Sequence, residues 1–246
     1  MLGLRKYKPA WNWIAHGKHP VAGDYFTLGV GDSLTKTICS WLDRGYQPCC
    51  QQGRQEEKAY SWRFWLKSPR KGALACGILK NSSDRSDRSY PLLIMGHGNL
   101  NGWEKNLQLL PLALEKTWVQ MEFISVQRYA ELSDFEREIA RVPAPGSDWD
   151  MLANAAGDQA QGKELLSACD CSVIERNAEL FSNLPTTTNE ELDRHILGLL
   201  MMLKTELAKI PTAIFIGGNM TNSAIYVLNR SLVLSDLKKL IDGKSY

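Results

Sequence analysis

The chain has 246 residues, of which 44% are hydrophobic and 23% charged, enough for one large domain or two small ones with a real core. Its 29 lysines and arginines nearly balance 27 aspartates and glutamates, which argues against electrostatic binding of nucleic acid or of an anionic membrane. No stretch approaches the roughly eighteen apolar residues of a spanning helix, and the basic N-terminus lacks the apolar run of a signal peptide. We therefore expect a cytoplasmic protein without membrane insertion, whose cysteines are reduced thiols.

The N-terminal part of the chain predicts irregular structure followed by one helix. Prolines and glycines interrupt residues 1–30, so neither helical nor strand periodicity is seen there. Asp32 or Ser33 is placed to cap a helix, which Gly45 is expected to end. Its apolar side chains share one face at helical spacing: Leu34, Ile38, Trp41 and Leu42.

The strongest strand signal follows this helix. In the first run, aromatic and apolar side chains alternate with polar ones, which predicts a strand with one buried face. Trp65 would lie on its other face and could anchor a protein partner if it stays exposed. A second run of small apolar residues is typical of a strand buried on both sides. Residues 96–99 predict a turn after the third run. The three predicted strands are residues 61–66, 73–79 and 90–95.

The second half of the chain predicts mainly helices. Pro111 lies within a run of apolar residues at helical spacing and would kink that helix or start a second one. Residues 141–150, rich in proline, form a candidate linker, and residues 151–183 predict one or two helices of modest stability. A capping-box pattern at residues 188–191 opens the strongest helix of the chain.

The chain closes with a predicted hairpin and a last helix. The hairpin strands are residues 212–216 and 224–228, and Ser235 is placed to cap the helix. Together these elements predict an α/β fold with a single mixed β-sheet of about five strands, covered by helices on both faces in a layered αβα arrangement. Strands from the two ends of the chain must then pair with each other. An independent C-terminal domain is the alternative.

The residue patterns predict no cofactor, metal ion or catalytic group. Ser33 and Lys36 match the S-x-x-K of serine acylases, but the companion motifs are missing, and a helix cap explains Ser33 better. The glycine-containing loop before this helix would place Asp32 where a bound phosphate should lie. Three residues close in sequence could in principle bind a metal ion: His16, His19 and Asp24. Hydrogen-bonded or solvated histidines are the better interpretation.

The charged connection at residues 84–88 leaves three interpretations open. Its charges can pair with one another in solvent, where each pair contributes little. Arg85 and Arg88 can present planar donors to a carboxylate or phosphate of a partner. Alternatively, these arginines anchor Asp24 in a buried ion pair. We expect the substitution Arg88→Ala to destabilise the fold more than it changes binding.

Two motifs, one on each side of the predicted strand at 61–66, resemble those of a known family. The later motif resembles the S-x-D-R-x-G-R-x-F-P-L signature of the TagF family of type VI secretion-associated proteins, in the form Ser82-x-Asp84-Arg85-x-x-Arg88-x-Tyr90-Pro91-Leu92. The earlier one is similar to that family's G-K-L-P-x-x-G-D-F, in the form Gly17-Lys18-His19-Pro20-Val21-Ala22-Gly23-Asp24-Tyr25-Phe26. The W-R-F strand with Trp62 lies between them, in the expected order. Three residues depart from the family pattern: His19 for leucine, Asp87 for glycine and Tyr90 for phenylalanine.

The resemblance implies a cytoplasmic accessory protein of the bacterial type VI secretion system. TagF-like proteins are post-translational regulators, usually repressors, that engage a scaffold protein with a forkhead-associated domain. The implied mechanism is therefore binding and sequestration rather than catalysis, without a cofactor. The resemblance assigns structural or partner-binding roles to the family-motif positions: Gly17, Lys18, Pro20, Gly23, Asp24, Trp62, Ser82, Asp84, Arg85, Arg88 and Pro91.

Two other functions are alternatives to the regulator. One is a structural adaptor within the secretion baseplate. The other is a hydrolase, whose site would be a pocket around Asp24, His97 and Arg88. In each case we expect residues 1–246 to form a single TagF-like domain with three parts: residues 1–140, which match the family best, a variable helical insertion at 143–187, and a helix with a closing hairpin and helix at 188–246.

Overall fold

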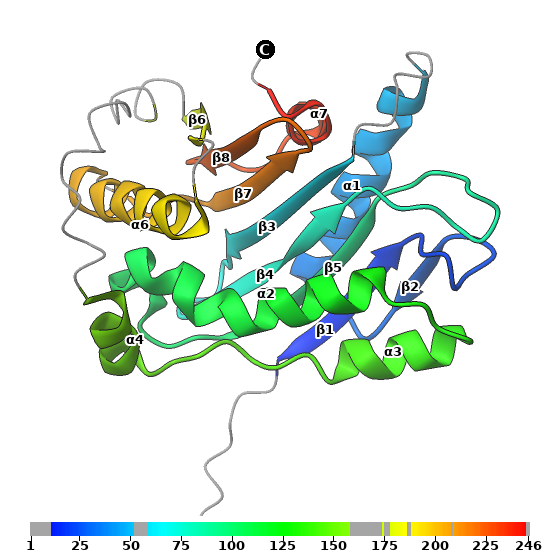
Figure 1. Cartoon of the computed structure of the whole chain (residues 1–246), viewed down its shortest axis with the longest axis horizontal. Helices are drawn as coiled ribbons and strands as arrows, with labels where there is room; N and C mark the ends of the chain where they lie inside the picture. The colour runs from blue at the N-terminus through cyan, green and yellow to red at the C-terminus, as the bar shows by residue number, and fades with distance from the viewer. Residues whose placement is uncertain are drawn as a thin grey trace, which may run out of the picture.

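The computed structural model describes residues 11–51, 59–157, 174, 178–185, 188–207 and 209–244. Its strands form one sheet in the order β2-β1-β5-β4-β3-β7-β8-β6, and every neighbouring pair is antiparallel (Figure 1). The prediction of a single sheet is confirmed, but the expected number of about five strands and the mixed strand direction are wrong. The strands are β1 (Asn12–Gly17), β2 (Phe26–Leu28), β3 (Tyr60–Lys67), β4 (Ala73–Lys80), β5 (Leu92–Asn99), β6 (Glu179–Asn183), β7 (Ala213–Asn219) and β8 (Ser223–Leu228).

Three strands at the edges of the sheet account for the error in strand number. β1 and β2 lie within residues 1–30, where irregular structure was expected, and β6 lies where a helix was expected. Their sequences carry little alternation because pairing with a neighbouring strand, rather than local pattern, decides their conformation. In β6, Phe181 packs against Trp62 and Tyr226, with ring centroids 6.2 and 5.5 Å apart. Most of the remaining residues of 151–183 lie outside the described part of the chain.

Strands from the N-terminal and C-terminal parts of the chain pair within the sheet. β3 pairs with β7, and Phe64 lies directly opposite Phe215. This pairing confirms that strands from the N- and C-terminal parts share one sheet, and β7 and β8 form the predicted hairpin.

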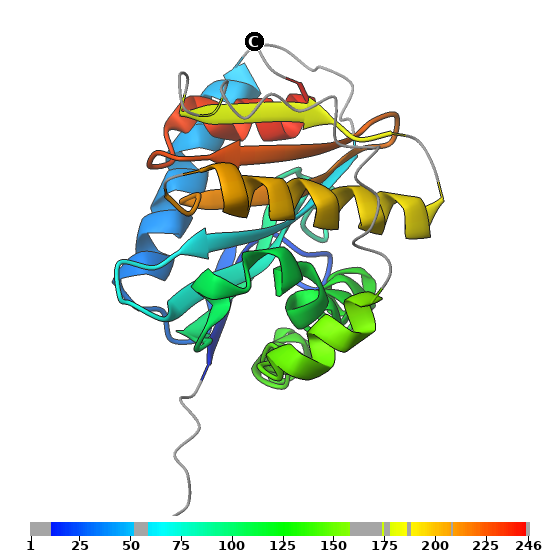
Figure 2. The ribbon, with the colours of Figure 1, turned by 90° about the vertical axis from the view of Figure 1, so that its left-hand side faces the viewer.

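Helices pack against both faces of the sheet, and Figure 2 shows α1 and α7 on one side with α2, α3 and α4 on the other. Trp62, Phe64 and Leu66 of β3 share a core with α1 and α7, whereas Trp65 faces the opposite core with α2. Trp65 is only 1% exposed, so β3 has two buried faces and Trp65 cannot anchor a partner. The helices are α1 (Ser33–Gln51), α2 (Leu110–Val126), α3 (Leu132–Ala140), α4 (Trp149–Ala156), α6 (Asn189–Glu206) and α7 (Leu234–Asp242), and the 3-10 turns are η1 (Trp103–Lys105) and η2 (Leu107–Leu109). Among the described residues, none of these helices is long and apolar enough to cross a membrane.

Glycines that predicted chain breaks serve close packing instead. The expected turn at residues 96–99 is the end of β5, where a Cβ on Gly96 or Gly98 would lie 1.9 or 2.6 Å from the rings of Trp13 and Trp11. Helix α1 does not end at Gly45 but continues through it. This glycine faces Leu237 of α7, and a Cβ there would lie 3.0 Å from that side chain. In each case the glycine makes room for a neighbouring side chain.

The predicted helix starts fared unevenly. Pro111 lies in the first turn of α2, where its missing N–H costs nothing, and Thr188 caps α6 through a bond to the Glu191 N–H of 3.4 Å. Helix α7, however, is not capped by Ser235. Its N-cap is Val233, whose backbone N–H donates to Asp236 at 2.8 Å.

Candidate functional site

Two loops leave the sheet side by side at one end of β1 and β5. Because β1 and β5 pair with Gly17 opposite Leu92, the loop after β1 meets the loop before β5. We call residues 17–25 and 81–91 together the two-loop junction. It contains every family-motif position except Trp62. That residue is fully buried elsewhere, with its indole Nε1 donating to the Leu240 carbonyl at 2.8 Å, so its role is structural.

A buried carboxylate joins the two loops. Asp84 is 1% exposed, and its Oδ2 lies 2.9 Å from the Lys18 ammonium and 2.8 Å from Arg88 Nε. Its Oδ1 accepts from the backbone N–H groups of Ser86 and Arg88, at 2.9 and 3.1 Å. Burial opposes ionisation of this group, but Lys18 and the backbone donors prevail and hold the pKa of Asp84 well below its usual range.

Glycine and proline fix how closely the loops approach. Gly17 has a φ of +121°, and a Cβ at that position would lie 1.9 Å from the Pro91 carbonyl oxygen. The Lys18 N–H donates to the same oxygen at 3.4 Å, and the Tyr90 N–H donates to the Ser82 carbonyl at 3.0 Å. A side chain at residue 17 would therefore push the loops apart.

The two arginines bind the backbone of the opposite loop. Arg85 Nη2 donates to the Val21 carbonyl at 2.6 Å, and Arg88 Nη2 donates to the Gly23 carbonyl at 2.8 Å. Arg88 also lies 3.5 Å from Asp24, but their side chains are 56% and 74% exposed. The hypothesis that an arginine anchors Asp24 in a buried pair is therefore wrong, and Asp84 takes that place.

The outer rim of the two-loop junction is open to solvent. Pro20, Gly23, Asp24, Arg85 and Arg88 are all exposed. A Cβ built on Gly23 would meet no atom of the described residues within 4 Å, so this part of the fold leaves space for a side chain there.

The residue that replaces the family's usual glycine keeps the backbone shape that glycine favours. Asp87 has a φ of +56°, in the left-handed region, and its N–H donates to the Asp84 carbonyl at 3.0 Å. Aspartate tolerates this region better than most residues with a side chain. The turn is thus retained despite the substitution.

A second polar group, missed by the sequence analysis, joins α1 to the two-loop junction. Asp43 of α1 accepts from His16 Nε2 at 2.8 Å, from Tyr90 OH at 2.5 Å and from Tyr25 OH at 3.2 Å. Burial and the nearby carboxylate raise the pKa of Tyr25 to about 12. The hydroxyl by which Tyr90 departs from the family's phenylalanine is thus used in a hydrogen bond. We call Asp43 with Tyr25, Tyr46 and Tyr90 the tyrosine–aspartate cluster.

The histidines considered for a metal site point to different places. His16 contacts Asp43, whereas His19 stacks on Phe135 of α3 with ring centroids 4.6 Å apart. Burial, together with the charge of Lys80, lowers the pKa of His19 to about 4. In the part of the chain that the structure describes, no three histidine, cysteine, aspartate or glutamate residues are grouped to hold a metal ion.

The predicted hydrolase pocket around Asp24, His97 and Arg88 is not formed. His97 pairs with Asn12 at the end of β5 opposite to the two-loop junction. There its Nδ1 contacts Asp32 and its Nε2 lies 3.1 Å from Ser68 Oγ.

Comparison with known proteins agrees with the motifs. The family model for the TagF N-terminal domain, type VI secretion system-associated, matches residues 15–142, which include the whole two-loop junction. No curated protein matches the chain. In fold, the chain is similar to the crystal structure of PA0076 from Pseudomonas aeruginosa PAO1, with a TM-score of 0.59, 15% identity and 96% of each chain covered. Because the family model covers more than half of it, this chain belongs to the TagF family of type VI secretion system-associated proteins.

Proposed function

We propose that the protein is a non-catalytic, cytoplasmic repressor of the type VI secretion system that binds the system's forkhead-associated-domain scaffold protein. The family match supports the system, and the class of partner is the one that the resemblance of the motifs implies. The observation that supports this surface is the two-loop junction, where the buried Asp84 carboxylate pairs with Lys18 and Arg88 and holds an exposed rim of polar groups in a fixed arrangement. A rim held in this way loses little conformational freedom on binding, which favours affinity.

Gly23 is the most informative residue of that rim. A glycine is commonly found where the backbone adopts a positive φ or approaches another atom closely, yet Gly23 has no positive φ and no close neighbour among the described residues. Close approach of a second molecule would account for a glycine at this family-motif position. The exposed guanidinium groups of Arg85 and Arg88 lie on the same rim and can donate to carboxylates of that molecule.

The test is capture of the scaffold protein by purified wild-type protein and by the variant Gly23→Leu. We expect the leucine to leave the melting temperature unchanged and to weaken binding at least tenfold, because it occupies space that the partner needs. The matched control is Gly146→Leu, since Gly146 is also exposed and its Cβ would meet only the Ala113 backbone, at 3.7 Å.

Equal binding by wild-type and Gly23→Leu would show that the rim is not part of the interface. Absence of binding by wild-type would contradict the proposed partner. The direction of regulation needs a separate measurement in the bacterium. Deletion of the gene should increase release of type VI secreted proteins, and a decrease would make the protein an activator.

Hydrolysis by a serine is a second candidate function, supported by one arrangement. Ser68, His97 and Asp32 lie in the order of a serine hydrolase triad, with Ser68 Oγ 3.1 Å from His97 Nε2. However, Ser68 is only 5% exposed, and its Oγ also accepts from the Arg70 N–H, at 3.2 Å. Covalent labelling of wild-type protein by a fluorophosphonate, abolished in Ser68→Ala, would support hydrolysis. Without labelling, the three residues are left with roles in a turn and a helix cap.

A further inference from the structure

The tyrosine–aspartate cluster holds a carboxylate whose charge is not neutralised. In the described part of the chain, Asp43 has no lysine or arginine within ion-pair distance. The only basic side chain in contact with it there is that of His16. Arg44, its neighbour in the sequence, lines a groove between α1 and the start of α7, together with Trp41 and Val233. The side chain of Asp43 is 38% exposed, so a partner can reach it.

The two oxygens of this carboxylate are used unequally. Oδ1 accepts from His16, Tyr90 and Tyr25, whereas the only donor to Oδ2 among the described residues is the Tyr25 hydroxyl, at 3.2 Å. A carboxylate oxygen has two lone pairs, so Oδ2 retains capacity for a further donor.

The rings around Asp43 form an aromatic corner. Tyr25 and Tyr90 meet edge to face, with centroids 5.4 Å apart and planes at 89°, and Tyr46 meets Tyr90 at 4.9 Å and 68°. Tyr25 is 43% exposed, so part of this corner is open to solvent. A cation placed here would be attracted both by the quadrupole of the aromatic rings and by the negative charge of the carboxylate.

We propose that the tyrosine–aspartate cluster binds an arginine side chain presented by the protein partner. Arginine fits better than lysine because its planar guanidinium stacks on aromatic rings while its N–H groups donate to a carboxylate. The cluster is continuous with the rim of the two-loop junction, since Tyr25 and Tyr90 belong to its two loops and Tyr25 follows the exposed Asp24. This inference rests on the proposed function and adds a basic anchor to the partner's side of that interface.

A purely structural role for Asp43 makes a different prediction. If the cluster only fastens α1 to the loops, Asp43→Asn should lower the melting temperature without altering binding to any cation. The first experiment therefore titrates protein carrying labelled tyrosine rings with the acetylated, amidated peptide Gly-Arg-Gly, observed by NMR. We expect saturable shifts of the Tyr25 and Tyr90 rings in the millimolar range, and no such shifts with the corresponding Gly-Gln-Gly peptide.

Asp43→Asn should weaken the peptide's effect at least tenfold, and the control Asp150→Asn, which neutralises an exposed carboxylate of α4, should not. Equal shifts by both peptides, or an unchanged response in Asp43→Asn, would overturn the inference. Should Asp43→Asn fail to fold, Tyr25→Ala removes a ring that is already 43% exposed and serves the same test.

The second experiment measures the dissociation constant of the scaffold protein for the same variants. A tenfold loss in Asp43→Asn supports the inference. Equal affinity of Asp43→Asn and wild-type overturns it while leaving the proposed function intact. If the scaffold protein does not bind wild-type, the proposed function fails, and the peptide titration still decides whether the cluster binds arginine.

Discussion

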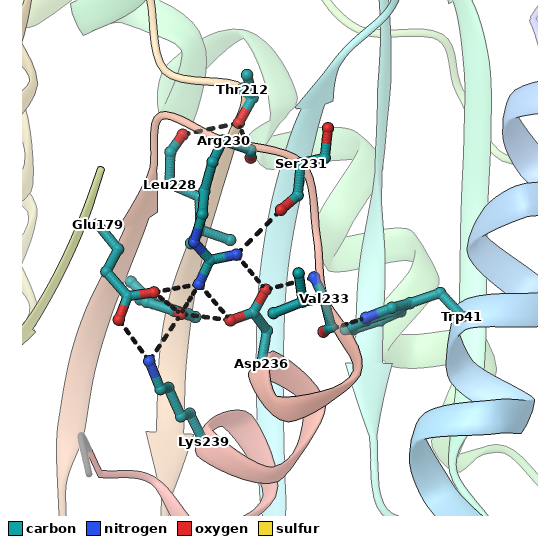
Figure 3. Close-up of polar contacts among 10 residues, drawn as sticks. Trp41, Glu179, Thr212, Leu228, Arg230, Ser231, Val233, Asp236 and Lys239 are labelled. Atoms are coloured by element: carbon teal, nitrogen blue, oxygen red, sulfur yellow. Dashed lines mark hydrogen bonds and ion pairs between the residues drawn. The ribbon is translucent and has the colours of Figure 1, made fainter. Parts of the chain in front are cut away.

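Two regions of the molecule bury an aspartate beside an arginine, and they do so in different ways. At the two-loop junction, Asp84 meets Lys18 and Arg88, and the two arginines there donate to backbone carbonyls of the opposite loop. The second region, the C-terminal charge cluster, consists of Glu179, Arg230, Asp236 and Lys239 with the hydroxyl of Tyr226 (Figure 3).

In the C-terminal charge cluster, side chains satisfy one another almost completely. Arg230 binds Asp236 through both terminal nitrogens, at 2.7 and 2.8 Å, and also contacts Glu179. Lys239 closes the cluster on Glu179 at 2.5 Å. Burial opposes ionisation of Asp236, but Arg230 outweighs it and lowers the pKa of this carboxyl. Two acids and two bases thus compensate each other, and the cluster ties β6 to β8 and α7.

The difference separates a structural cluster from a candidate interface. Arg230 is 27% exposed and is saturated by carboxylates, whereas Arg88 is 56% exposed and faces solvent beside Asp24. Burial of a charge is therefore a poor guide to function, because both regions have it. What distinguishes the two-loop junction is the set of polar groups that it holds at the surface.

The largest effect expected from this comparison is that of Asp236→Ala. The variant leaves Arg230 without its main partner and removes the acceptor for the Val233 N–H, so it should lower the free energy of unfolding by about 3–5 kcal/mol. Urea denaturation measures the loss. The control Asp134→Ala breaks only the exposed pair with Arg137 and should cost less than about 0.5 kcal/mol.

Binding sharpens the same test. At a temperature where Asp236→Ala is folded, its affinity for the scaffold protein should equal that of wild-type, because the C-terminal charge cluster presents nothing to a partner. If Asp236→Ala has the stability of wild-type, or if it is folded but binds the scaffold protein more weakly, the distinction between the two regions is wrong.

The second effect concerns pH at the two-loop junction. The folded state holds His19 neutral, with a pKa of about 4 against an ordinary value of 6.5. The unfolded chain therefore binds more protons between these values, so stability is fully present above pH 6.5 and decreases as pH falls toward 4. The decrease amounts to at most about 3 kcal/mol for a pKa shift of this size.

His19→Leu, which restores the family's usual residue, should remove this dependence. Denaturation at a series of pH values between 7 and 4 checks it. The carboxylates of the C-terminal charge cluster have lowered pKa values, so their stabilisation is lost only as pH falls below their ordinary values of 4.5 and 3.8, near or below the lower end of this window. Identical pH profiles of His19→Leu and wild-type would show that another group is responsible.

The sequence predicted local features well and long-range ones poorly. β4 and the start of α2 at Pro111 follow from strong local signals, and both are confirmed. β1, β2 and β6 were missed because pairing decides them: β1 pairs with β5, β2 with β1, and β6 with β8. Alternation in β3 identified its two faces, but it could not show that a helix covers the second one.

The same limit applies to the candidate site. The motifs located the two-loop junction, but they suggested Asp24 as the buried partner of arginine, and Asp84 fills that place because it lies beneath the backbone turn. Nothing in the sequence around Asp43 itself marked it, since its partners are contributed by three separate segments. A tyrosine in place of the usual phenylalanine at Tyr90 was the one indication of a nearby acceptor.

The smallest effect tests whether the backbone shapes the two-loop junction, in contrast to the side chains of the C-terminal charge cluster. Asp87 adopts a φ of +56°, and glycine meets no steric penalty in that region. Asp87→Gly should therefore raise the free energy of unfolding by roughly 0.5–1 kcal/mol, and Asp87→Ala should lower it by a similar amount. Asp87→Asn is the control, because asparagine tolerates this conformation but removes the charge. Thermal denaturation should rank the variants as glycine, then aspartate and asparagine together, then alanine. If alanine equals aspartate, the left-handed residue does not limit the turn, and the loss of the family's glycine has no consequence for stability.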